Sequence, residues 1–420
     1  MREILFLAHR VPWPPDRGDK IRSFHILNKL KTLAPVHVGA FADDARDMGF
    51  AESERAGLAS LHVELRNKPQ WLAGIEALAR DMPISLTSFG SRTMQDWVDE
   101  RLASGSISHI FVFSGQMAQY VPADFDGRLV MDFVDVDSAK FESYANGGNG
   151  FMRWINAREG KKLAAFETEI AARADASLFV SDAEAELFRH RSGANNVVGV
   201  GNGIDTVFYD PATAFKKLHP VFPDPLIVFT GQMDYRPNIE AVSDFAQNAL
   251  PAIRAVHPDT TFAIVGRNPT EAVSALSALP GVQVTGAVDD VRTWLAGADV
   301  VVAPLRIARG IQNKVLEAMA MAKPVMVSKA AAEGIDAKDK KHFRVAKSVA
   351  DEAKIVSELL TDVDARLRLG AAARAHVIAH YGWDRQLAAL DEILQPTKTR
   401  HSRAGGNPSP GLTASNEVAL

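Results

Sequence analysis

The segment "ARGIQNKVLEAMAMAKPV", residues 308–325, places a lysine and a glutamate in the opening half of a mostly apolar helix pattern. The predicted helix runs from about Gln312 to Ala322 and follows a loop, Arg306 to Gly310. Lys314 lies in its first turn, where the helix dipole disfavours a cation by about 0.3 to 1 kcal/mol. The unpaired amides of the same turn attract an anion, ideally a phosphate. A bound diphosphate would therefore turn an unfavourable position for Lys314 into a favourable one.

Glu317 stands three residues beyond Lys314, so the two side chains project from neighbouring parts of one helix face. A carboxylate beside a nucleotide commonly accepts hydrogen bonds from the two ribose hydroxyls. The alternative is an exposed ion pair between Glu317 and Lys314, which would contribute about 0.2 to 0.5 kcal/mol. The residue types favour the nucleotide site and leave the ion pair open.

Short β-branched and aromatic runs alternate with longer helix patterns, which is typical of parallel sheets with crossover helices. In the first half we predict strands at 3–8, 36–41, 62–65, 110–114, 129–134 and 177–181, with helices that include 20–33 and 153–173. The strand runs of the second half are "LIVFTG", "TFAIVG", "VQVTG", "DVVVAP" and "PVMVS". Gly231, Gly266 and Gly286 therefore follow predicted parallel strands at their carboxyl ends, where open α/β sheets bind ligands. The alternative for each glycine is an ordinary turn residue.

Length and composition predict a globular protein of two domains. At 420 residues the chain exceeds the usual size of one core, and its 47% apolar and 23% charged residues are ordinary for a soluble protein. A Gly- and Pro-rich stretch near residues 205–224 predicts the linker. We predict an α/β fold of two doubly wound Rossmann-like domains that face each other across a cleft. The predicted boundaries are 1–205 for the N-terminal domain, 206–380 for the C-terminal domain, 381–395 for a terminal helix and 396–420 for a disordered tail.

The composition also excludes or disfavours several classes of function. The absence of cysteine excludes disulfides, thiolate nucleophiles and cysteine metal sites, and the net charge of −4 argues against bulk nucleic-acid binding. Because the histidines are scattered and "DVD" is a pattern of low specificity, we predict no metal site. The apolar run Ile4 to Ala8 is too short for a signal-peptide core, and no apolar run of about 18 residues follows. These features predict a cytoplasmic protein.

The loop "RVPWPPDRGDK" joins the first predicted strand to the first predicted helix. Its prolines make it stiff, while Gly18 allows close approach of the backbone to a ligand. Arg17 and Lys20 are candidate ligand contacts, and the alternative for both is a solvated loop charge.

The segment "VMDFVDVDSAK" continues a predicted buried strand and carries three carboxylates. Strand alternation places Asp132 and Val134 on one face and leaves Asp135 at the end of the strand, near the cleft. Asp135 is therefore the first candidate for a polar contact to the reacting hydroxyls, and Asp137 is the second. The alternative is that both are ordinary loop acids.

Two further loops of the second half carry polar side chains after strands. Gly231 and Gln232 open the loop "GQMDYRPN", in which Asn238 is the expected N-cap of the next helix. Arg236 in this loop is a candidate contact to the diphosphate. Arg267 follows the next strand, and a buried structural role for it is disfavoured because an unpaired arginine is rarely buried.

The run "NKVLEAMAMAKPV" resembles the sugar-nucleotide segment of the family 4 glycosyltransferases, which are retaining enzymes of the GT-B fold. Other segments agree with this family in order and spacing, up to about residue 394: "VPWPPDRGDKIRS", "SLFVSDAEAELF", "VGNGIDTVFYDP", "FTGQMDYRPNIEAV", "FAIVGRNP" and "GAVDDVRTWLAGADVVVAPLR". The set "PWPPDRGDKIRS", "MDFVDVDSAKF" and "GIQNKVLEAMAMAKPV" is similar to the sugar transferases of bacterial exopolysaccharide and exosortase (PEP-CTERM) loci.

The resemblance implies roles for individual residues of the two domains. Together with the residue types, it predicts a catalytic set of Asp135, Lys314 and Glu317, and a donor-binding set of Gly18, Gly231, Gln232, Arg236, Gly266, Arg267, Arg309, Gly310, Ile311 and Asn313. Relatives often carry a histidine close to the place of Asp135, and this chain has none there. The family usually has a first glutamate eight residues before the second, but Arg309 occupies that place here, while Glu317 keeps the second. Since the first glutamate is implied to touch the transferred sugar, the identity of the sugar stays open.

The resemblance implies a retaining hexosyltransferase that moves a sugar from a nucleoside diphosphate sugar to a glycan or lipid-linked acceptor in exopolysaccharide biosynthesis. It implies no cofactor and no nucleic-acid partner, and it leaves open a peripheral contact with the cytoplasmic face of the inner membrane. Two alternatives are a sugar-nucleotide epimerase of the same fold and a non-catalytic scaffold that binds sugar nucleotides. The base, the sugar, the acceptor, the oligomeric state and the catalytic group are not determined by the sequence.

Overall fold

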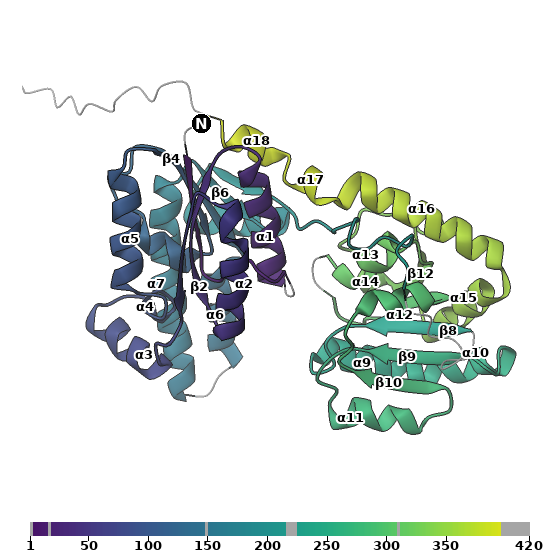
Figure 1. Ribbon diagram of the computed structural model, residues 1–420. Coiled ribbons are helices and arrows are strands. Elements are labelled where there is room, and N and C mark those ends of the chain that lie inside the picture. The colour runs from purple at the N-terminus through teal and green to yellow at the C-terminus, as the bar shows by residue number, and fades with distance from the viewer. Residues whose placement is uncertain (1–2, 16–17, 148–149, 216–224, 309–310, 396–420) are drawn as a thin grey trace, which may run out of the picture.

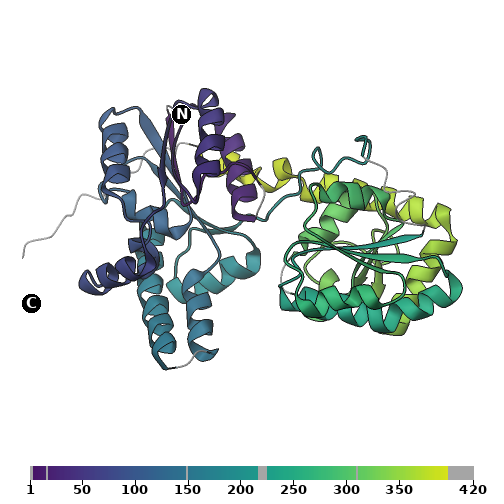
Figure 2. The same ribbon diagram turned by 60° about the horizontal axis from the view of Figure 1, so that its bottom comes forward.

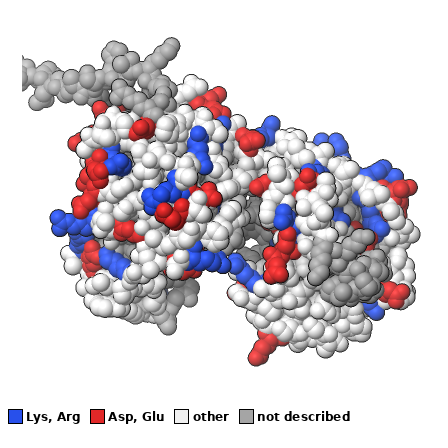
Figure 3. Space-filling view, viewed as in Figure 1, with Lys and Arg blue, Asp and Glu red and all other residues white. Residues whose placement is uncertain are grey.

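The computed structural model describes residues 3–15, 18–147, 150–215, 225–308 and 311–395. These residues form two α/β domains, each a parallel sheet with helices on both faces (Figures 1 and 2). The predicted fold class is confirmed. The space-filling view has a hollow where the two domains face each other (Figure 3).

The N-terminal domain is built on a parallel sheet with strand order β3-β2-β1-β4-β5-β6-β7. Its strands are β1 (Glu3–Ala8), β2 (Val36–Ala42), β3 (Ser60–Leu65), β4 (Ile107–Phe113), β5 (Arg128–Val134), β6 (Ala176–Phe179) and β7 (Val197–Gly199). Its helices are α1 (Gly18–Lys31), α2 (Ala45–Glu54), α3 (Gln70–Ala79), α4 (Ile84–Thr87), α5 (Arg92–Ala103), α6 (Asp137–Gly147), α7 (Gly150–Arg173) and α8 (Asp182–Ser192), with 3-10 turns at Arg55–Gly57 and Gly115–Tyr120. The predicted strands of the first half each lie on one of β1 to β6.

The C-terminal domain repeats the arrangement with strand order β10-β9-β8-β11-β12-β13. Its strands are β8 (Leu226–Thr230), β9 (Thr261–Val265), β10 (Val282–Gly286), β11 (Val300–Ala303), β12 (Val325–Ser328) and β13 (Arg344–Ala346). Its helices are α9 (Arg236–Asp244), α10 (Leu250–Val256), α11 (Glu271–Ser274), α12 (Val291–Gly297), α13 (Asn313–Ala320), α14 (Lys329–Ala332), α15 (Val349–Thr361) and α16 (Val363–Tyr381), with a π-helical turn at Phe245–Ala249 and a 3-10 turn at Ala275–Ala278.

Each sheet changes its winding direction at one place. In the C-terminal domain β8 pairs with β9 on one side and with β11 on the other. The chain after β8 therefore continues toward one edge of the sheet, and the chain after β11 continues toward the other edge. The crevice beyond the carboxyl ends of two such strands is where doubly wound sheets bind ligands. Here Gly231 follows β8 and helix α13 follows β11, so the topology directs the lysine-bearing helix to this crevice.

The end of the described chain crosses back from one domain to the other. Helix α16 packs on the C-terminal core, and the following short helices α17 (Trp383–Gln386) and α18 (Ala389–Ile393) pack on the N-terminal domain (Figure 1). Leu387, Leu390 and Leu394 are almost completely buried there, and the Nε2 atom of His109 lies 3.0 Å from the carbonyl oxygen of Leu394. The segment predicted as one terminal helix at 381–395 thus holds two helices and covers a face of the first sheet.

The predicted linker at 205–224 is described up to residue 215, and the predicted disordered tail at 396–420 lies outside the described residues. Within the described ranges, no helix has the length and apolarity needed to cross a bilayer.

Candidate functional site

A pocket of about 750 Å³ opens at the crevice between β8 and β11. Its walls come from the ends of β8, β9 and β10, from the start of α13 and from the segment that joins the domains. It is lined by Phe208, Tyr209, Thr230, Gly231, Gln232, Tyr235, Asn238, Val265, Gly266, Arg267, Ala287, Val288, Asp289, Asp290, Val291, Asn313, Lys314 and Glu317. The helix amides and the ammonium group predicted to meet an anion therefore face one pocket.

Lys314 is held at the bottom of the first turn of α13. Its Nζ atom donates a hydrogen bond of 2.6 Å to Oδ1 of Asn238 and lies 4.1 Å from the centroid of the Phe229 ring. Burial lowers the pKa of Lys314 from its ordinary 10.5 to about 7, although the nearby Glu317 carboxyl opposes the shift. Burial thus disfavours the charged state of Lys314, which a bound anion would stabilise.

Two glycines make room for this arrangement. A Cβ atom at Gly231 would lie 2.9 Å from Nζ of Lys314 and 2.8 Å from Nδ2 of Asn238. A Cβ atom at Gly266 would lie 1.6 Å from the carbonyl oxygen of Gly231, a clash that only a backbone shift could relieve. Close approach of the backbone therefore requires a glycine at position 266, whereas a Cβ atom at position 231 would displace the Lys314 and Asn238 side chains.

Glu317 contacts a tyrosine from the interdomain segment. The Tyr209 hydroxyl donates a hydrogen bond to the Glu317 carboxyl, and burial raises the pKa of Tyr209, so the hydroxyl stays protonated. Burial also raises the pKa of Glu317, while Tyr209 and Lys314 both favour its ionised form. Lys314 and Glu317 each have another hydrogen-bond partner, Asn238 and Tyr209 respectively. The exposed ion pair that the sequence left open does not form.

A stacked arginine fixes the wall on the side of the linker. The Arg292 guanidinium lies 3.7 Å from the centroid of the Phe208 ring and donates to the Phe208 carbonyl at 3.0 Å. Asp290 accepts from Nε and Nη2 of Arg292 at 3.0 and 2.8 Å. This cluster ties the linker segment to α12 and thereby positions Tyr209 beside Glu317.

The predicted catalytic and donor-binding residues fall into three groups. Those that line the pocket are Gly231, Gln232, Gly266, Arg267, Asn313, Lys314 and Glu317. Those that lie elsewhere are Gly18 and Asp135 in the N-terminal domain, Ile311, which packs against the C-terminal core, and Arg236, whose Nε donates to Glu240 at 2.7 Å on an exposed turn of α9. Arg309 and Gly310 lie outside the described residues.

Asp135 occupies an exposed position just after β5. Its position depends on Asp132, which is fully buried. The Asp132 carboxylate forms an ion pair of 2.9 Å with Nε of Arg22 and accepts a hydrogen bond of 3.0 Å from the Val134 amide. Val134 has a left-handed backbone with φ 71°, which is uncommon for a β-branched residue. The bend at Val134 turns Asp135 out of the sheet, while burial raises the pKa of the second candidate, Asp137.

The first loop differs from the expectation at two residues. Lys20 is buried and forms an ion pair of 2.6 Å with Asp47, so it is neither a solvated charge nor open to a ligand. Gly18 is the first residue of α1, and an added Cβ there would meet no atom within 4 Å. In this conformation close packing does not require a glycine at position 18.

Several pocket residues were not found by sequence reasoning. Tyr209 lies in a segment without clear periodicity, and its contact with Glu317 is not visible from spacing. Arg292, which holds this segment without lining the pocket, was not singled out either. Asn238 was predicted as an N-cap, but it is the third residue of α9, and its amide bridges Lys314 and the carbonyl of Gln232. The only sequence signal for Asn238 was that a polar residue directly follows Pro237 at the start of a predicted helix.

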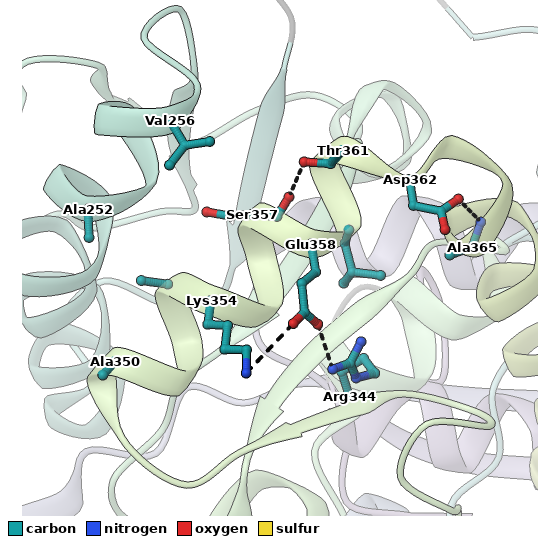
Figure 4. A pocket seen from close by; sticks show the side chains of 12 residues that line it. Ala252, Val256, Arg344, Ala350, Lys354, Ser357, Glu358, Thr361, Asp362 and Ala365 are labelled. Carbon is teal, nitrogen blue, oxygen red and sulfur yellow. Dashed lines mark hydrogen bonds and ion pairs between the residues drawn. The ribbon is translucent and has the colours of Figure 1, made fainter.

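A second pocket, of about 830 Å³, lies between α10 and α15 (Figure 4). Its charged groups neutralise one another, because Glu358 pairs with Nη2 of Arg344 at 3.0 Å and with Nζ of Lys354 at 4.0 Å. Much of the remaining lining is alanine. The pocket beside α13 therefore has the stronger set of convergent polar groups. Among the described residues, no group of three histidine or carboxylate side chains is arranged to hold a metal ion.

Residues 224–362 match the family described as "Glycosyl transferases group 1". This range contains the glycine-terminated strands, α13 and all the pocket residues except those of the linker segment.

Two relatives cover part of the chain. The phosphatidyl-myo-inositol mannosyltransferase of Propionibacterium freudenreichii is 30% identical over 225 residues, 51% of this chain and 54% of its own length. The GDP-mannose-dependent monoacylated alpha-(1-6)-phosphatidylinositol monomannoside mannosyltransferase of Corynebacterium glutamicum is 26% identical over 246 residues, 54% of this chain and 64% of its own length. The matched part of the chain thus spans between half and two thirds of these relatives.

Solved structures match nearly the whole chain. HepE of Anabaena, determined in complex with UDP and glucose, superposes with a TM-score of 0.59 at 16% identity and covers 94% of this chain and 99% of its own. A glycosyltransferase from Rickettsia africae superposes with a TM-score of 0.61 at 14% identity and covers 93% and 97%. The chain therefore has the GT-B fold, and residues 224–362 are similar to the glycosyl transferases group 1.

Proposed function

We propose that this protein is a retaining glycosyltransferase that uses a nucleoside diphosphate sugar as its donor. In the reaction the bond between the anomeric carbon and the diphosphate oxygen breaks, and a bond forms between that carbon and an acceptor hydroxyl oxygen. The nucleoside diphosphate leaves with the bonding electrons, and the hydroxyl proton is released. Charge accumulates on the diphosphate, so groups that stabilise this charge accelerate the step.

The observation that carries the proposal is the position of Lys314. Its ammonium group lies in a pocket at a helix N-terminus, between the ends of β8 and β11, where the backbone amides and the charge face the same space. The ammonium group is buried with Asn238 as its hydrogen-bond partner and Glu317 as the nearby carboxylate, and burial still disfavours its charged state, which a bound anion would stabilise. A diphosphate has the negative charge and the size to bind beside the Lys314 ammonium group in this pocket.

Each polar group of the pocket then has a role in the proposal. Lys314 and the amides of α13 neutralise the leaving diphosphate, and Glu317, oriented by Tyr209, accepts hydrogen bonds from the ribose hydroxyls. The exposed Asp135 contacts the acceptor hydroxyl from the opposite domain. The diphosphate and the base of the donor contact the residues after β8 and β9, which are Gly231, Gln232, Gly266 and Arg267. The carboxylate of Asp290 fixes the neighbouring wall through its hydrogen bonds with Arg292.

The relatives support a choice of donor and acceptor. One is named as GDP-mannose-dependent, and both are named for transfer to phosphatidylinositol or its monomannoside. We therefore propose GDP-mannose as the first donor to test, and a lipid-linked glycan at the cytoplasmic membrane face, in exopolysaccharide biosynthesis, as the acceptor.

Incubation with nucleoside diphosphate sugars and a lipid extract tests the activity. Acceptor-dependent release of nucleoside diphosphate, with the product in the same anomeric configuration by NMR, is the expected result. Nucleotide release without any acceptor would favour an epimerase of this fold, while tight binding with no turnover on any donor or extract would favour a non-catalytic scaffold. A product of inverted configuration would contradict the retaining reaction.

Replacing Glu317 by alanine tests the ribose contact. We expect the Glu317→Ala protein to fold and to bind nucleoside diphosphate sugar more weakly by about 1 to 3 kcal/mol, because hydrogen bonds to a charged group are lost. Titration calorimetry on both proteins gives the difference. The control is Glu358→Ala, which removes a partly exposed carboxylate from the second pocket and leaves donor affinity unchanged. Unchanged affinity in a folded Glu317→Ala protein would remove this residue from the donor site.

The lowered pKa of Lys314 predicts a pH-dependent affinity. In the empty protein the lysine loses its proton as the pH rises through about 7, while a bound diphosphate raises that pKa. Below pH 7 both states hold the proton, and the affinity for a nucleoside diphosphate sugar, which has no terminal phosphate that titrates in this range, is flat. Above pH 7 the bound state holds more protons, so the affinity falls by up to about tenfold per pH unit. Calorimetry from about pH 6 to about pH 9 checks this slope, which should vanish in Lys314→Gln.

A further inference from the structure

Helix α3 of the N-terminal domain turns its small residues inward and its large ones outward. Ala73 and Ala77 are completely buried, whereas Trp71, Leu72, Ile75 and Leu78 are between 41% and 68% exposed. A helix that served only to cover its sheet would bury the larger side chains, because burial stabilises in proportion to apolar area. The apolar face of α3 is thus directed toward something outside the domain.

A second apolar group lies at the start of α7 and the end of α6. Four large side chains there are between 49% and 73% exposed: Phe151, Met152 and Trp154 at the start of α7, and Tyr144 near the end of α6. The rings of Phe151 and Trp154 stack at 6.4 Å between centroids. These side chains, like those of α3, are too large to be exposed in a cluster without a partner.

The two groups belong to one surface. Nη2 and Nη1 of Arg158 on α7 donate to the carbonyls of Ala77 and Met82 at 3.0 and 3.1 Å, so α7 is bound directly to the end of α3. Both views place α3 beside the tip of α6 and α7 at the same end of the domain, and that end is mostly uncharged in the space-filling view (Figures 1, 2 and 3). We call this the aromatic end, defined by Trp71, Leu72, Ile75, Leu78, Tyr144, Phe151, Met152 and Trp154.

Basic side chains border the aromatic end. Residues 150–162 carry four basic residues, Arg153, Arg158, Lys161 and Lys162, while their one acid, Glu159, is buried and accepts from the Ile84 and Ser85 amides. Arg153 and Lys161 are exposed. Asp81 pairs with Arg158 at 3.5 Å and with Lys162 at 2.5 Å. The exposed Arg153 and Lys161 therefore provide the local excess of positive charge, in contrast to the net charge of −4 for the whole chain.

We propose that the aromatic end docks on the surface of a bilayer that contains anionic lipid. Trp, Tyr and Phe prefer the boundary between headgroups and acyl chains, and basic side chains beside them attract anionic headgroups. Helix α3 lies in the boundary with its large side chains among the acyl chains, as an interfacial helix does. The inference deepens the membrane-side acceptor of the proposed function, but its test needs neither donor nor acceptor, so the two can fail separately.

Sedimentation of the full chain with vesicles tests the apolar part. We compare vesicles of phosphatidylcholine alone with vesicles that also contain phosphatidylglycerol. The double variant Trp71→Ser, Trp154→Ser should bind the mixed vesicles at least about tenfold more weakly than the unchanged protein. The matched control is Leu367→Ser, Ile378→Ser, which removes two similarly exposed side chains from α16 and should bind as the unchanged protein does.

A second pair of variants tests the charge. Arg153→Gln with Lys161→Gln should reduce the affinity for mixed vesicles by about fivefold for each charge and leave binding to pure phosphatidylcholine unchanged. The control Lys341→Gln with Arg368→Gln removes two exposed charges from the C-terminal domain and should have no effect.

The oligomeric state is measured on the same proteins by sedimentation velocity. Binding of the unchanged protein to mixed vesicles, lost in the tryptophan variant but not in its control, supports the proposal. Absence of vesicle binding overturns it, as does equal binding by the tryptophan variant. A self-associated protein that becomes monomeric in that variant, without vesicle binding, would show that the aromatic end joins two copies of the chain instead.

Discussion

Replacement of Lys314 by glutamine is expected to reduce turnover by about 100- to 1000-fold while the empty protein remains as stable as before or slightly more stable. Removal of one preorganised group that stabilises transition-state charge typically has an effect of this size. The empty protein, by contrast, holds the ammonium against a helix N-terminus and out of water, so its removal relieves a cost of tenths of a kcal/mol to about 1 kcal/mol. Glutamine can still donate a hydrogen bond to Asn238. Steady-state rates and thermal unfolding of the empty protein give the two quantities.

Lys323 offers a matched control in the same domain. It is also a partly buried lysine whose pKa burial lowers, and its Nζ donates to the Ala296 carbonyl at 2.7 Å, but it lies outside the pocket. Lys323→Gln should therefore turn over normally. Normal turnover with a lowered melting temperature in Lys314→Gln would mean that Lys314 is structural and would remove the diphosphate from the pocket.

Loss of the Asp132 carboxylate is expected to destabilise the protein by about 3 to 5 kcal/mol, because it leaves the Arg22 guanidinium buried without its partner. The same carboxylate accepts from the Val134 amide and so stabilises the left-handed turn that directs Asp135 outward. Urea unfolding of Asp132→Ala measures the loss. If the single variant fails to fold, the pair Asp132→Leu with Arg22→Met, which removes both charges, should fold and recover most of the stability.

An exposed pair provides the comparison for this result. Glu186→Ala removes a carboxylate that pairs with Arg189 on the surface of α8, and it should change the free energy of unfolding by less than about 0.5 kcal/mol. A similarly small change in Asp132→Ala would show that the buried pair contributes no more than a surface one.

The fold could be predicted because its strands are short continuous apolar runs, most of which end in Gly or Pro in the C-terminal domain, and such runs are buried on both faces of a parallel sheet. Lys314 and Glu317 of α13 could also be found, because charged side chains are unusual within an otherwise apolar helix pattern. The residues that contact them could not be predicted. Tyr209 and Asn238 approach Lys314 and Glu317 from other elements, and only the packing of the domain brings them together.

Side-chain direction limited the other predictions. Arg236 was predicted in the loop, but it is the first residue of α9, and its long flexible side chain pairs with the carboxylate of Glu240 one helical turn away. Asp135 lies directly after β5, as alternation along the strand predicted, but the left-handed backbone of Val134 that turns it outward is not marked by any sequence pattern. The inverted helix α3 was not recognised, because its apolar residues read equally well as a buried face.

The return of α17 and α18 to the first domain affects the order in which the chain folds during synthesis. One side of the N-terminal sheet is covered by Trp383, Leu387, Leu390 and Leu394, so its core is complete only after residue 394 has left the ribosome. The domain that is synthesised first is therefore finished last, and its apolar surface stays open while the second domain is being made. A nascent chain stopped near residue 205 should accordingly bind chaperones that recognise exposed apolar segments, and the addition of a peptide spanning residues 383–394 should release it.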